Sequence, residues 1–211
     1  MKTGFSGMLK LGFVLAVFAA AACIMLAFVY SVTSAIIAQR QQADLEATLK
    51  ELFPEADSFE AIGDITSPDP AVTIENAYVA IKKGMPYGAA LSISRASYSG
   101  QIKTMVGVNS DGHITGVKIM EHSDTPGLGA NAASPSYFVD REKGLTFYGQ
   151  FTGKHVTHPF RVKDDVIAIT ASTITSHAVS SSVKAAGLAV SAWLAGKEPD
   201  IITSATRRTA E

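Results

Sequence analysis

Residues 170–176, with the sequence TASTITS, have residue types that could bind a phosphate. The segment supplies five hydroxyl groups, and a helical pattern begins within it. Unpaired N–H groups and the positive dipole end of a helix favour an anion at its start, and hydroxyls add further donors. A single capping hydroxyl on Ser172 or Thr173 is the simpler alternative. One cap needs one hydroxyl, whereas this segment offers several.

Residues 124–130, with the sequence DTPGLGA, are typical of a tight turn that follows a strand. Pro126-Gly127 favours a type II turn, and Gly129 permits a positive φ or a close approach of backbone to a ligand. The spacing does not match the dinucleotide-binding or Walker phosphate loops. Taken alone, this segment predicts a turn and nothing more specific.

The N-terminal region predicts a membrane anchor. Residues 11–30 contain no charged side chain, and twenty helical residues rise roughly 30 Å, enough to cross the hydrocarbon core of a bilayer. A cleaved signal peptide is the alternative, but its apolar region would be about 7–15 residues long. We therefore expect an uncleaved, single-pass transmembrane helix within residues 1–38, with membrane lipid around residues 11–30.

Basic residues are nearly balanced on the two sides of the predicted span. Lys2 and Lys10 precede it, and Arg40 and Lys50 follow it. The positive-inside rule slightly favours an internal N-terminus. This predicts a bacterial inner-membrane protein whose soluble domain lies on the outer, periplasmic face. The net charge of −1 gives no electrostatic argument for a nucleic-acid partner, and the single cysteine, Cys23, excludes an intramolecular disulfide.

The remaining pattern predicts an α+β domain. Residues 39–53 resemble a charged helix ended by Pro54, and residues 56–70 a linker, so residues 39–70 form a juxtamembrane helix and linker. The soluble domain is expected at residues 71–196, and a polar tail at residues 197–211.

Within that domain, alternating residues predict an antiparallel meander with packed helices. The expected strands are 77–81, 89–98, 102–108 and 114–120. Residues 82–86 and 109–112 are expected turns, the second closing a hairpin. Residues 131–148 are expected to form a helix or a loop. Residues 174–194 have the clearest helical stripe, and Gly196 is expected to end that helix.

Several of these segments resemble a known family. Residues 124–130 match its acidic-Thr-Pro-Gly-Leu-Gly-Ala motif closely, residues 105–117 look like its preceding hairpin, and residues 147–154 match more weakly. The chain thereby resembles the FMN-binding family that includes the G subunit of the Rnf electron-transport complex. It is also similar to the C subunit of Na⁺-translocating NADH:quinone reductase. The resemblance covers the anchor and most of the outer domain.

In this family, FMN is joined through its phosphate to a threonine, in a motif that reads roughly Asp-x-x-Ser/Thr-Gly-Ala-Thr. The match makes Thr173 the acceptor and Thr170 the first hydroxyl. The family's Asp, Gly and Ala fall on Ile167, Ala171 and Ser172, and the nearest acids, Asp164 and Asp165, are out of register. The cofactor-binding residues that the resemblance implies are Thr170, Ser172, Thr173, Ile174, Thr175, Asp124, Thr125, Gly127, Leu128, Gly129 and Lys163.

The resemblance implies an electron-transfer subunit that relays electrons through covalent FMN in an Rnf-type ferredoxin:NAD⁺ oxidoreductase coupled to Na⁺ or H⁺ transport. Its partners would be other integral-membrane and Fe–S or flavin subunits, and a flavin transferase would mature it. No complete active site and no catalytic residue are expected on this chain alone. A flavin-free scaffold or assembly subunit, a C-type subunit of the quinone reductase, and a stand-alone anchored flavoprotein remain alternatives.

The histidines, Tyr98 and Lys163 support weaker functional predictions. His155-x-x-His158 has metal-ligand spacing but no further clustered ligands, so no metal site is expected. His122 adjoins the 124–130 segment and is either a strand-end residue or a group that tunes a flavin or a proton. Tyr98 is expected to pack in the core or sheet rather than to stack on a flavin ring. Lys163 is either a surface residue or a partner of the flavin's phosphate or ring oxygens.

Overall fold

The computed structural model describes residues 5–63 and 65–208, with side chains described within residues 7–63 and 65–196. The chain divides into two compact units, residues 1–47 and residues 48–211. The first unit contains most of helix α1 (Phe5–Leu52), and the second contains the end of that helix and all other elements.

The first unit is an apolar helix without a protein core around it. Large apolar side chains along α1 are exposed, including Phe13, Leu15, Phe18 and Leu26, each at 70–72%. The segment Gly7–Leu52 is long and apolar enough to cross a membrane, and its most apolar stretch is 0% buried within the protein. So much exposed apolar surface is typical of a segment solvated by lipid. Thr173–Gly196 is also long and apolar enough to cross a membrane, but 56% of its apolar stretch is buried, as in a core helix.

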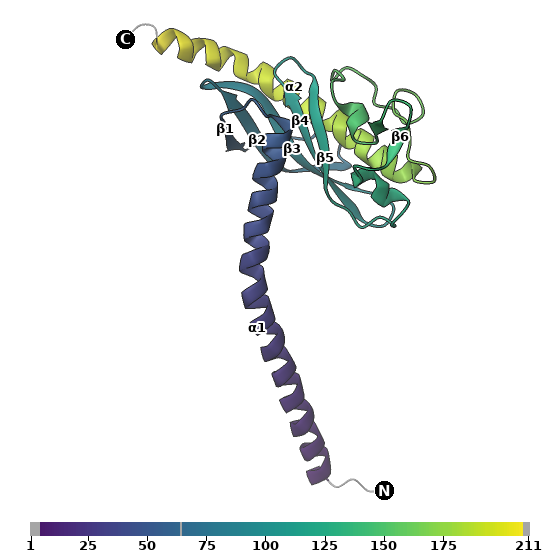
Figure 1. The fold of residues 1–211 in the computed structure, drawn as a ribbon. Helices are drawn as coiled ribbons and strands as arrows, with labels where there is room; N and C mark the ends of the chain where they lie inside the picture. Colours follow the sequence, from purple (N-terminus) through teal and green to yellow (C-terminus); the bar gives the residue numbers. More distant parts are fainter. Residues whose placement is uncertain (1–4, 64, 209–211) are drawn as a thin grey trace. The chain divides into compact units, whose positions relative to one another are not determined.

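The second unit is built on a five-stranded antiparallel sheet in the order β1-β2-β3-β4-β5 (Figure 1). The strands are β1 (Ser58–Ile62), β2 (Val72–Lys82), β3 (Met85–Ala96), β4 (Gln101–Asn109) and β5 (Ile114–Glu121). Each strand pairs with its neighbour in the chain. The predicted antiparallel meander and α+β class are therefore confirmed.

The turns of the meander follow local residue chemistry. Lys83 and Gly84 connect β2 to β3 with φ angles of 52° and 75°, the paired positive values of a type I′ hairpin turn. At the predicted hairpin between β4 and β5, the Asn109 side-chain oxygen accepts the N–H groups of Asp111 and His113 at 3.1 and 2.8 Å. These contacts end β4 and begin β5, as predicted.

Several predictions about element boundaries were wrong, among them that of β3, which spans Met85–Ala96 rather than residues 89–98. Residues 56–70 are not all linker, because β1 lies within them and pairs with β2. Strand β2 begins at Val72 rather than at residue 77. Helix α2 (Thr173–Arg208) continues past Gly196. A glycine inside a helix costs only about 1 kcal/mol, so Gly196 is a weak stop signal, and the expected polar tail is helical in its described part.

Between β5 and α2 the chain is mostly irregular. It contains the 3₁₀ helices η1 (Gly129–Ala133) and η2 (Gly149–Phe151) and a small hairpin of β6 (Phe138–Asp140) and β7 (Leu145–Thr146). The expected helix or loop at residues 131–148 is thus a loop that contains two short strands. Val166 and Ile169 are each 1% exposed, so buried side chains fix this long connection.

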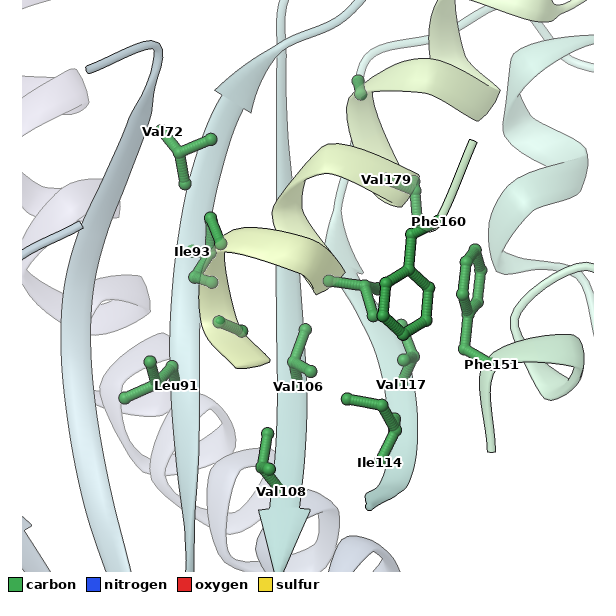
Figure 2. Close-up of a cluster of buried hydrophobic side chains, with 14 of the residues drawn as sticks. Val72, Leu91, Ile93, Val106, Val108, Ile114, Val117, Phe151, Phe160 and Val179 are labelled. Carbon is green, nitrogen blue, oxygen red and sulfur yellow. The ribbon is translucent and has the colours of Figure 1, made fainter. Parts of the chain in front are cut away.

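The main core lies between one face of the sheet and α2 (Figure 2). Alternating residues of the central strands, such as Leu91 and Ile93 on β3 and Val106 and Val108 on β4, are 0% exposed. They point toward the same side because side chains alternate along a strand. Val179 and Phe160 close the cluster from α2 and from the irregular connection.

The opposite face of the sheet receives the end of α1. Leu52 and Phe53 are 4% and 1% exposed, and they pack against three glycines of the sheet, Gly88, Gly107 and Gly116. A Cβ atom on Gly88 would come within 2.8 Å of a Phe53 ring carbon, and one on Gly116 within 2.8 Å of a Leu52 methyl. Because glycine has no side chain, these three positions leave room for Leu52 and Phe53. The compact unit that contains the sheet therefore begins at Thr48 rather than at residue 71.

Truncating Phe53 should destabilise the sheet domain strongly. Phe53→Ala removes a ring that is 1% exposed and packs edge-on against Tyr87, and such changes cost about 3–5 kcal/mol. Urea unfolding of the full chain in detergent would measure the loss. Phe138→Ala is the matched control, since Phe138 is 40% exposed and should change the free energy of unfolding by less than about 1 kcal/mol. Equal effects of the two substitutions would contradict the packing argument.

Candidate functional site

The start of α2 offers hydrogen-bond donors to a ligand. The first helical bond runs from the Ser176 N–H to the Ser172 carbonyl at 3.0 Å, so Ser172 occupies the capping position. Among the described residues, the N–H groups of Thr173, Ile174 and Thr175 have no backbone acceptor. These groups and the helix dipole favour a negatively charged ligand at this position.

The hydroxyls of the 170–176 segment differ sharply in accessibility. Thr173 and Thr170 are exposed, whereas Ser172, Thr175 and Ser176 are 7%, 1% and 0% exposed. The Ser176 hydroxyl accepts the Ile169 N–H at 3.0 Å and donates to the Ser172 carbonyl at 2.9 Å. Only part of the hydroxyl cluster is therefore open to a ligand.

The 124–130 segment forms the predicted turn. The Leu128 N–H donates to the Thr125 carbonyl at 3.1 Å, and Gly127 has a φ of 78°, which together define a type II turn. Gly129 begins η1, directly after the turn. The turn brings Thr125, Leu128 and Gly129 toward the start of α2.

Asp124 links three separate segments of the pocket wall. Its carboxylate is 5% exposed and accepts the Ser97 hydroxyl at 2.6 Å, the Ser99 N–H at 3.0 Å and the Thr175 hydroxyl at 2.7 Å. Burial alone would raise the pKa of Asp124, but these hydrogen bonds, with a smaller contribution from His122, lower it below its ordinary value of 3.8. Asp124 is therefore an ionised, hydrogen-bonded carboxylate at neutral pH.

Gly129 lies where no side chain fits. A Cβ atom there would come within 2.6 Å of the Thr175 hydroxyl oxygen and 2.7 Å of the Asp124 Cβ. The glycine thus lets the turn approach the contact between Asp124 and Thr175. This close approach explains why the motif carries glycine at this position.

Together these elements line a pocket of about 470 Å³. Its walls are Tyr98, Asp124, Thr125, Leu128, Gly129, Ala171, Ser172, Thr173, Ile174 and Thr175. Eight of the eleven predicted cofactor-binding residues therefore lie in one place, although they come from segments about 45 residues apart. The volume lies within the range of small-molecule sites, about 300–1,000 Å³.

Three predicted cofactor-binding residues do not line this pocket. Gly127 serves the turn, and its carbonyl accepts the Asn131 side-chain amide at 2.9 Å. Thr170 lies outside the pocket wall, with its N–H 3.4 Å from the Tyr137 hydroxyl. Lys163 is an exposed residue of the preceding turn, where its N–H donates to the Val166 carbonyl. The surface interpretation of Lys163 fits this position better than a pocket role.

Tyr98 is placed differently from the expectation. It is 72% exposed and lines the pocket, so the prediction that it packs in the core was wrong. Leu128 and Ile174, at 41% and 55% exposed, also line the pocket. The pocket therefore combines apolar side chains with backbone donors, a combination that fits a flat aromatic ring carrying a phosphate.

Ala171, in the pocket wall, has a strained backbone with a φ of 59°. Left-handed backbone costs an L-residue about 1–2 kcal/mol relative to glycine. Ala171→Gly should therefore raise the free energy of unfolding by about 0.5–1 kcal/mol, measured by urea titration. The control is Ala168→Gly, because Ala168 is not among the residues with positive φ and glycine there should destabilise. A loss of stability in Ala171→Gly would refute the strain argument.

The histidines do not join the pocket. His122 lines a separate surface depression with Gln101, Met120, Glu121 and Ser123. His155 Nδ1 lies 2.8 Å from the Thr157 hydroxyl, and His158 Nδ1 lies 3.9 Å from an Asp165 oxygen. In the described part of the chain, no group of three or more His, Cys, Asp and Glu side chains is arranged to hold a metal ion.

Comparison with known proteins identifies both parts of the chain. Residues 97–187 match the FMN-binding domain, and residues 1–52 match the RnfG N-terminal region. The G subunit of the proton-translocating ferredoxin:NAD⁺ oxidoreductase complex of Clostridium ljungdahlii is 32% identical over 179 residues, which are 82% of this chain and 86% of that protein. This chain belongs to the family of G subunits of ion-translocating oxidoreductase complexes.

Two further relatives agree with this assignment. The G subunit of the Na⁺-translocating ferredoxin:NAD⁺ oxidoreductase complex of Acetobacterium woodii is 31% identical over 192 residues, 82% of this chain and 87% of that protein. The G subunit of the ion-translocating oxidoreductase complex of Aliivibrio fischeri is 32% identical over 177 residues, 71% of this chain and 83% of that protein. The family resemblance inferred from the sequence is therefore confirmed.

The pocket lies within the matched FMN-binding domain, since its lining residues run from Tyr98 to Thr175. The family assignment supports FMN as the cofactor and an electron-transfer role in an oxidoreductase. The apolar first unit and the membrane complexes of the relatives indicate membrane anchoring. The pocket's apolar wall and backbone donors are consistent with a flavin mononucleotide.

Proposed function

We propose that this chain relays electrons through an FMN whose phosphate is esterified to Thr173, within an ion-translocating ferredoxin:NAD⁺ oxidoreductase. One observation carries the proposal. Thr173 is an exposed residue at the start of α2, where the N–H groups of residues 173–175 have no backbone acceptor among the described residues, and it lines a pocket of about 470 Å³.

Accessibility favours Thr173 over its neighbours as the acceptor. The Thr175 hydroxyl is 1% exposed and donates to Asp124, and Ser172 is 7% exposed. Thr170 is exposed but does not line the pocket. Thr173 therefore combines an accessible oxygen with a position at the helix start, where a phosphate's negative charge is stabilised.

Different pocket residues would contact different parts of the cofactor. The N–H groups at the start of α2 would hold the phosphate, and Tyr98, Leu128 and Ile174 would contact the flavin ring system. FMN supplies the electron-transfer chemistry, while the protein supplies position and electrostatic surroundings. The chain needs no general acid or base for this relay.

Attachment would require a separate flavin transferase and an activated flavin nucleotide. The Thr173 oxygen forms a bond to phosphorus, the bond from phosphorus to the donor's leaving group breaks, and the leaving group takes the electron pair. The hydroxyl proton passes to a base of the transferase. The pocket would hold the product by the groups described above.

The remaining features of the proposal concern the complex. Helix α1 would anchor the chain in the bacterial inner membrane as a single span, with the sheet domain on the outer face and other integral-membrane and Fe–S or flavin subunits as partners. Relatives from a proton-translocating and an Na⁺-translocating complex are 32% and 31% identical. Sequence identity to these relatives therefore does not indicate whether the coupling ion is H⁺ or Na⁺.

A flavin-free scaffold subunit is the second candidate. The departures at Ile167, Ala171 and Ser172 from the expected attachment motif favour it, and the strained φ of 59° at Ala171 marks one of them. In this alternative the chain would assemble with the complex without carrying electrons.

The mass of the intact protein purified from its native membrane distinguishes the two functions. We expect an added mass equal to one esterified FMN and a fluorescent band after denaturing electrophoresis. A bare polypeptide mass, from cells in which another protein is flavinylated, would refute the relay and leave the scaffold.

A further inference from the structure

Gln150, in η2, clamps the backbone of a residue far along the chain. Its side-chain oxygen accepts the Ile167 N–H at 2.7 Å, and its side-chain nitrogen donates to the Ile167 carbonyl at 3.1 Å. The same nitrogen donates to the Phe147 carbonyl at 2.9 Å. One amide thus engages both backbone groups of Ile167, as a neighbouring strand would.

This clamp is made in a buried environment. Gln150 is 6% exposed, and Phe147 and Phe151 on either side of it are 0% exposed. The bond to Phe147 is buried and the two bonds to Ile167 are partly buried, so leaving the Ile167 N–H and carbonyl without these partners would cost free energy. The Ile167 side chain is itself 44% exposed, so this residue is held through its backbone and by the buried neighbours Val166 and Ile169.

Residue 167 is the first of a segment, residues 167–172, that is neither helix nor strand. Three of its six N–H groups are bound by side chains outside the segment: Ile167 by Gln150, Ile169 by the Ser176 hydroxyl at 3.0 Å, and Thr170 by the Tyr137 hydroxyl at 3.4 Å. A fourth, that of Ser172, donates to the Ile169 carbonyl of the segment itself at 3.0 Å. The segment leads directly to Thr173. Its shape therefore depends on these outside side chains as well as on one backbone hydrogen bond of its own.

Gln150 and Ser176 hold opposite ends of the 167–172 segment. Ser176 lies on α2 and fixes the end of the segment near Thr173, whereas Gln150 lies on η2 and fixes its beginning. With both ends fixed, the exposed residues between them are presented as a loop of defined shape on the surface. Those exposed residues include Ile167, Thr170, Ala171 and Thr173.

We propose that Gln150 is a positioning residue for flavin attachment, which holds the 167–172 segment so that Thr173 is presented to the flavin transferase. This rests on the function proposed above. Gln150 does not line the pocket and takes no part in bond formation. It acts on the reaction through the backbone of Ile167.

The test compares Gln150→Met with Thr146→Ala in the full chain, produced without flavin transferase and then supplied with transferase and its flavin donor. Methionine keeps the length of the side chain and removes all three hydrogen bonds. Thr146→Ala is the matched control, since the Thr146 hydroxyl oxygen accepts the Gly149 N–H at 3.1 Å in the same turn and, among the described hydrogen bonds, has none to residues 167–172. The initial rate of flavin incorporation is measured by intact mass.

We expect Gln150→Met to incorporate flavin at least fivefold more slowly than the wild type, and Thr146→Ala to stay within twofold of it. Hydrogen exchange before attachment should accelerate at residues 167–172 in Gln150→Met, while the amides of residues 178–190 in α2 stay protected. This second readout separates a loosened segment from general unfolding. Gln150→Glu, which keeps the oxygen that accepts the Ile167 N–H, should give an intermediate rate and replaces Gln150→Met if that variant does not fold.

Wild-type incorporation rates in Gln150→Met would overturn the role of Gln150, whatever the exchange rates show. A slow rate without faster exchange at residues 167–172 would also overturn it, because the clamp would then not act through the segment. If the wild type and Thr146→Ala both fail to take up flavin, covalent attachment itself is wrong. The failure of this inference and the failure of the proposed function thus give different results.

Discussion

Replacing Thr173 by alanine is expected to abolish covalent flavin while leaving the domain folded. Thr173 is exposed and its hydroxyl makes no hydrogen bond within the described residues, so its removal should change the free energy of unfolding by less than about 1 kcal/mol. No neighbouring hydroxyl is placed to replace it, because Thr175 is held by Asp124 and Ser172 is buried. Intact mass and in-gel fluorescence would show the loss, and circular dichroism would show the retained fold.

Two further variants make this result specific. Thr173→Ser keeps a hydroxyl and should retain covalent flavin, although a slower attachment is expected. Thr170→Ala removes the other exposed hydroxyl of the segment and should retain full flavin content. Covalent flavin in Thr173→Ala, mapped by peptide mass to another residue, would show that the assigned acceptor is wrong.

Replacing Asp124 by alanine should be the most destabilising change in the pocket wall. Three donors, from Ser97, Ser99 and Thr175, lose their acceptor together. The Thr175 hydroxyl is buried, and leaving such a group without a partner costs about 1–3 kcal/mol. Ser97 is half-buried and Ser99 is exposed, so water can replace part of their bonds, and a total loss of about 2–4 kcal/mol is expected on urea unfolding at neutral pH. Asp124→Asn keeps the shape of the side chain and one acceptor oxygen, and should lose less.

The effect of Asp124 should also depend on pH. The pKa of Asp124 is lower in the folded protein than its ordinary value of 3.8, so the folded state favours the ionised form. The stabilisation is therefore complete above the ordinary pKa and is lost as the pH falls through the lower, folded pKa. The stability difference between the wild type and Asp124→Asn should shrink below about pH 4. A difference that stays constant between pH 7 and pH 3 would contradict this assignment.

Much of the fold could be predicted because its signals are local. The Asn109–Gly112 hairpin and the Pro126-Gly127 turn follow from residues with special backbone preferences, and both form as predicted. The long helix beginning near Ile174 follows from its apolar stripe. The family motif, which contains those turn residues, assigned Thr125, Leu128 and Gly129 to a cofactor pocket. In the structure these residues line one pocket with the start of α2, and their contact with a flavin stays a prediction.

Other features could not be predicted because they depend on partners distant in sequence. Strand β1, with the sequence SFEAI, is short and mostly exposed, and it becomes a strand through pairing with β2. Ser97 and Ser99 become functional through a carboxylate 25–27 residues away. Gln150 lay in a weakly matched stretch, and nothing local indicates that its amide binds Ile167, 17 residues further on. Such contacts have no signature in periodicity or turn chemistry.

The three hydrogen bonds of Asp124 also imply an order of events during biogenesis. They join the turn after β3 to the start of α2, and the bond to Thr175 spans 51 residues. The pocket wall consequently exists only after α2 has docked on a completed sheet. Any enzyme that recognises this wall must act after synthesis and folding of the domain, so maturation would also report that folding has succeeded. An unfinished chain would present the same threonine without the surroundings that distinguish it from every other.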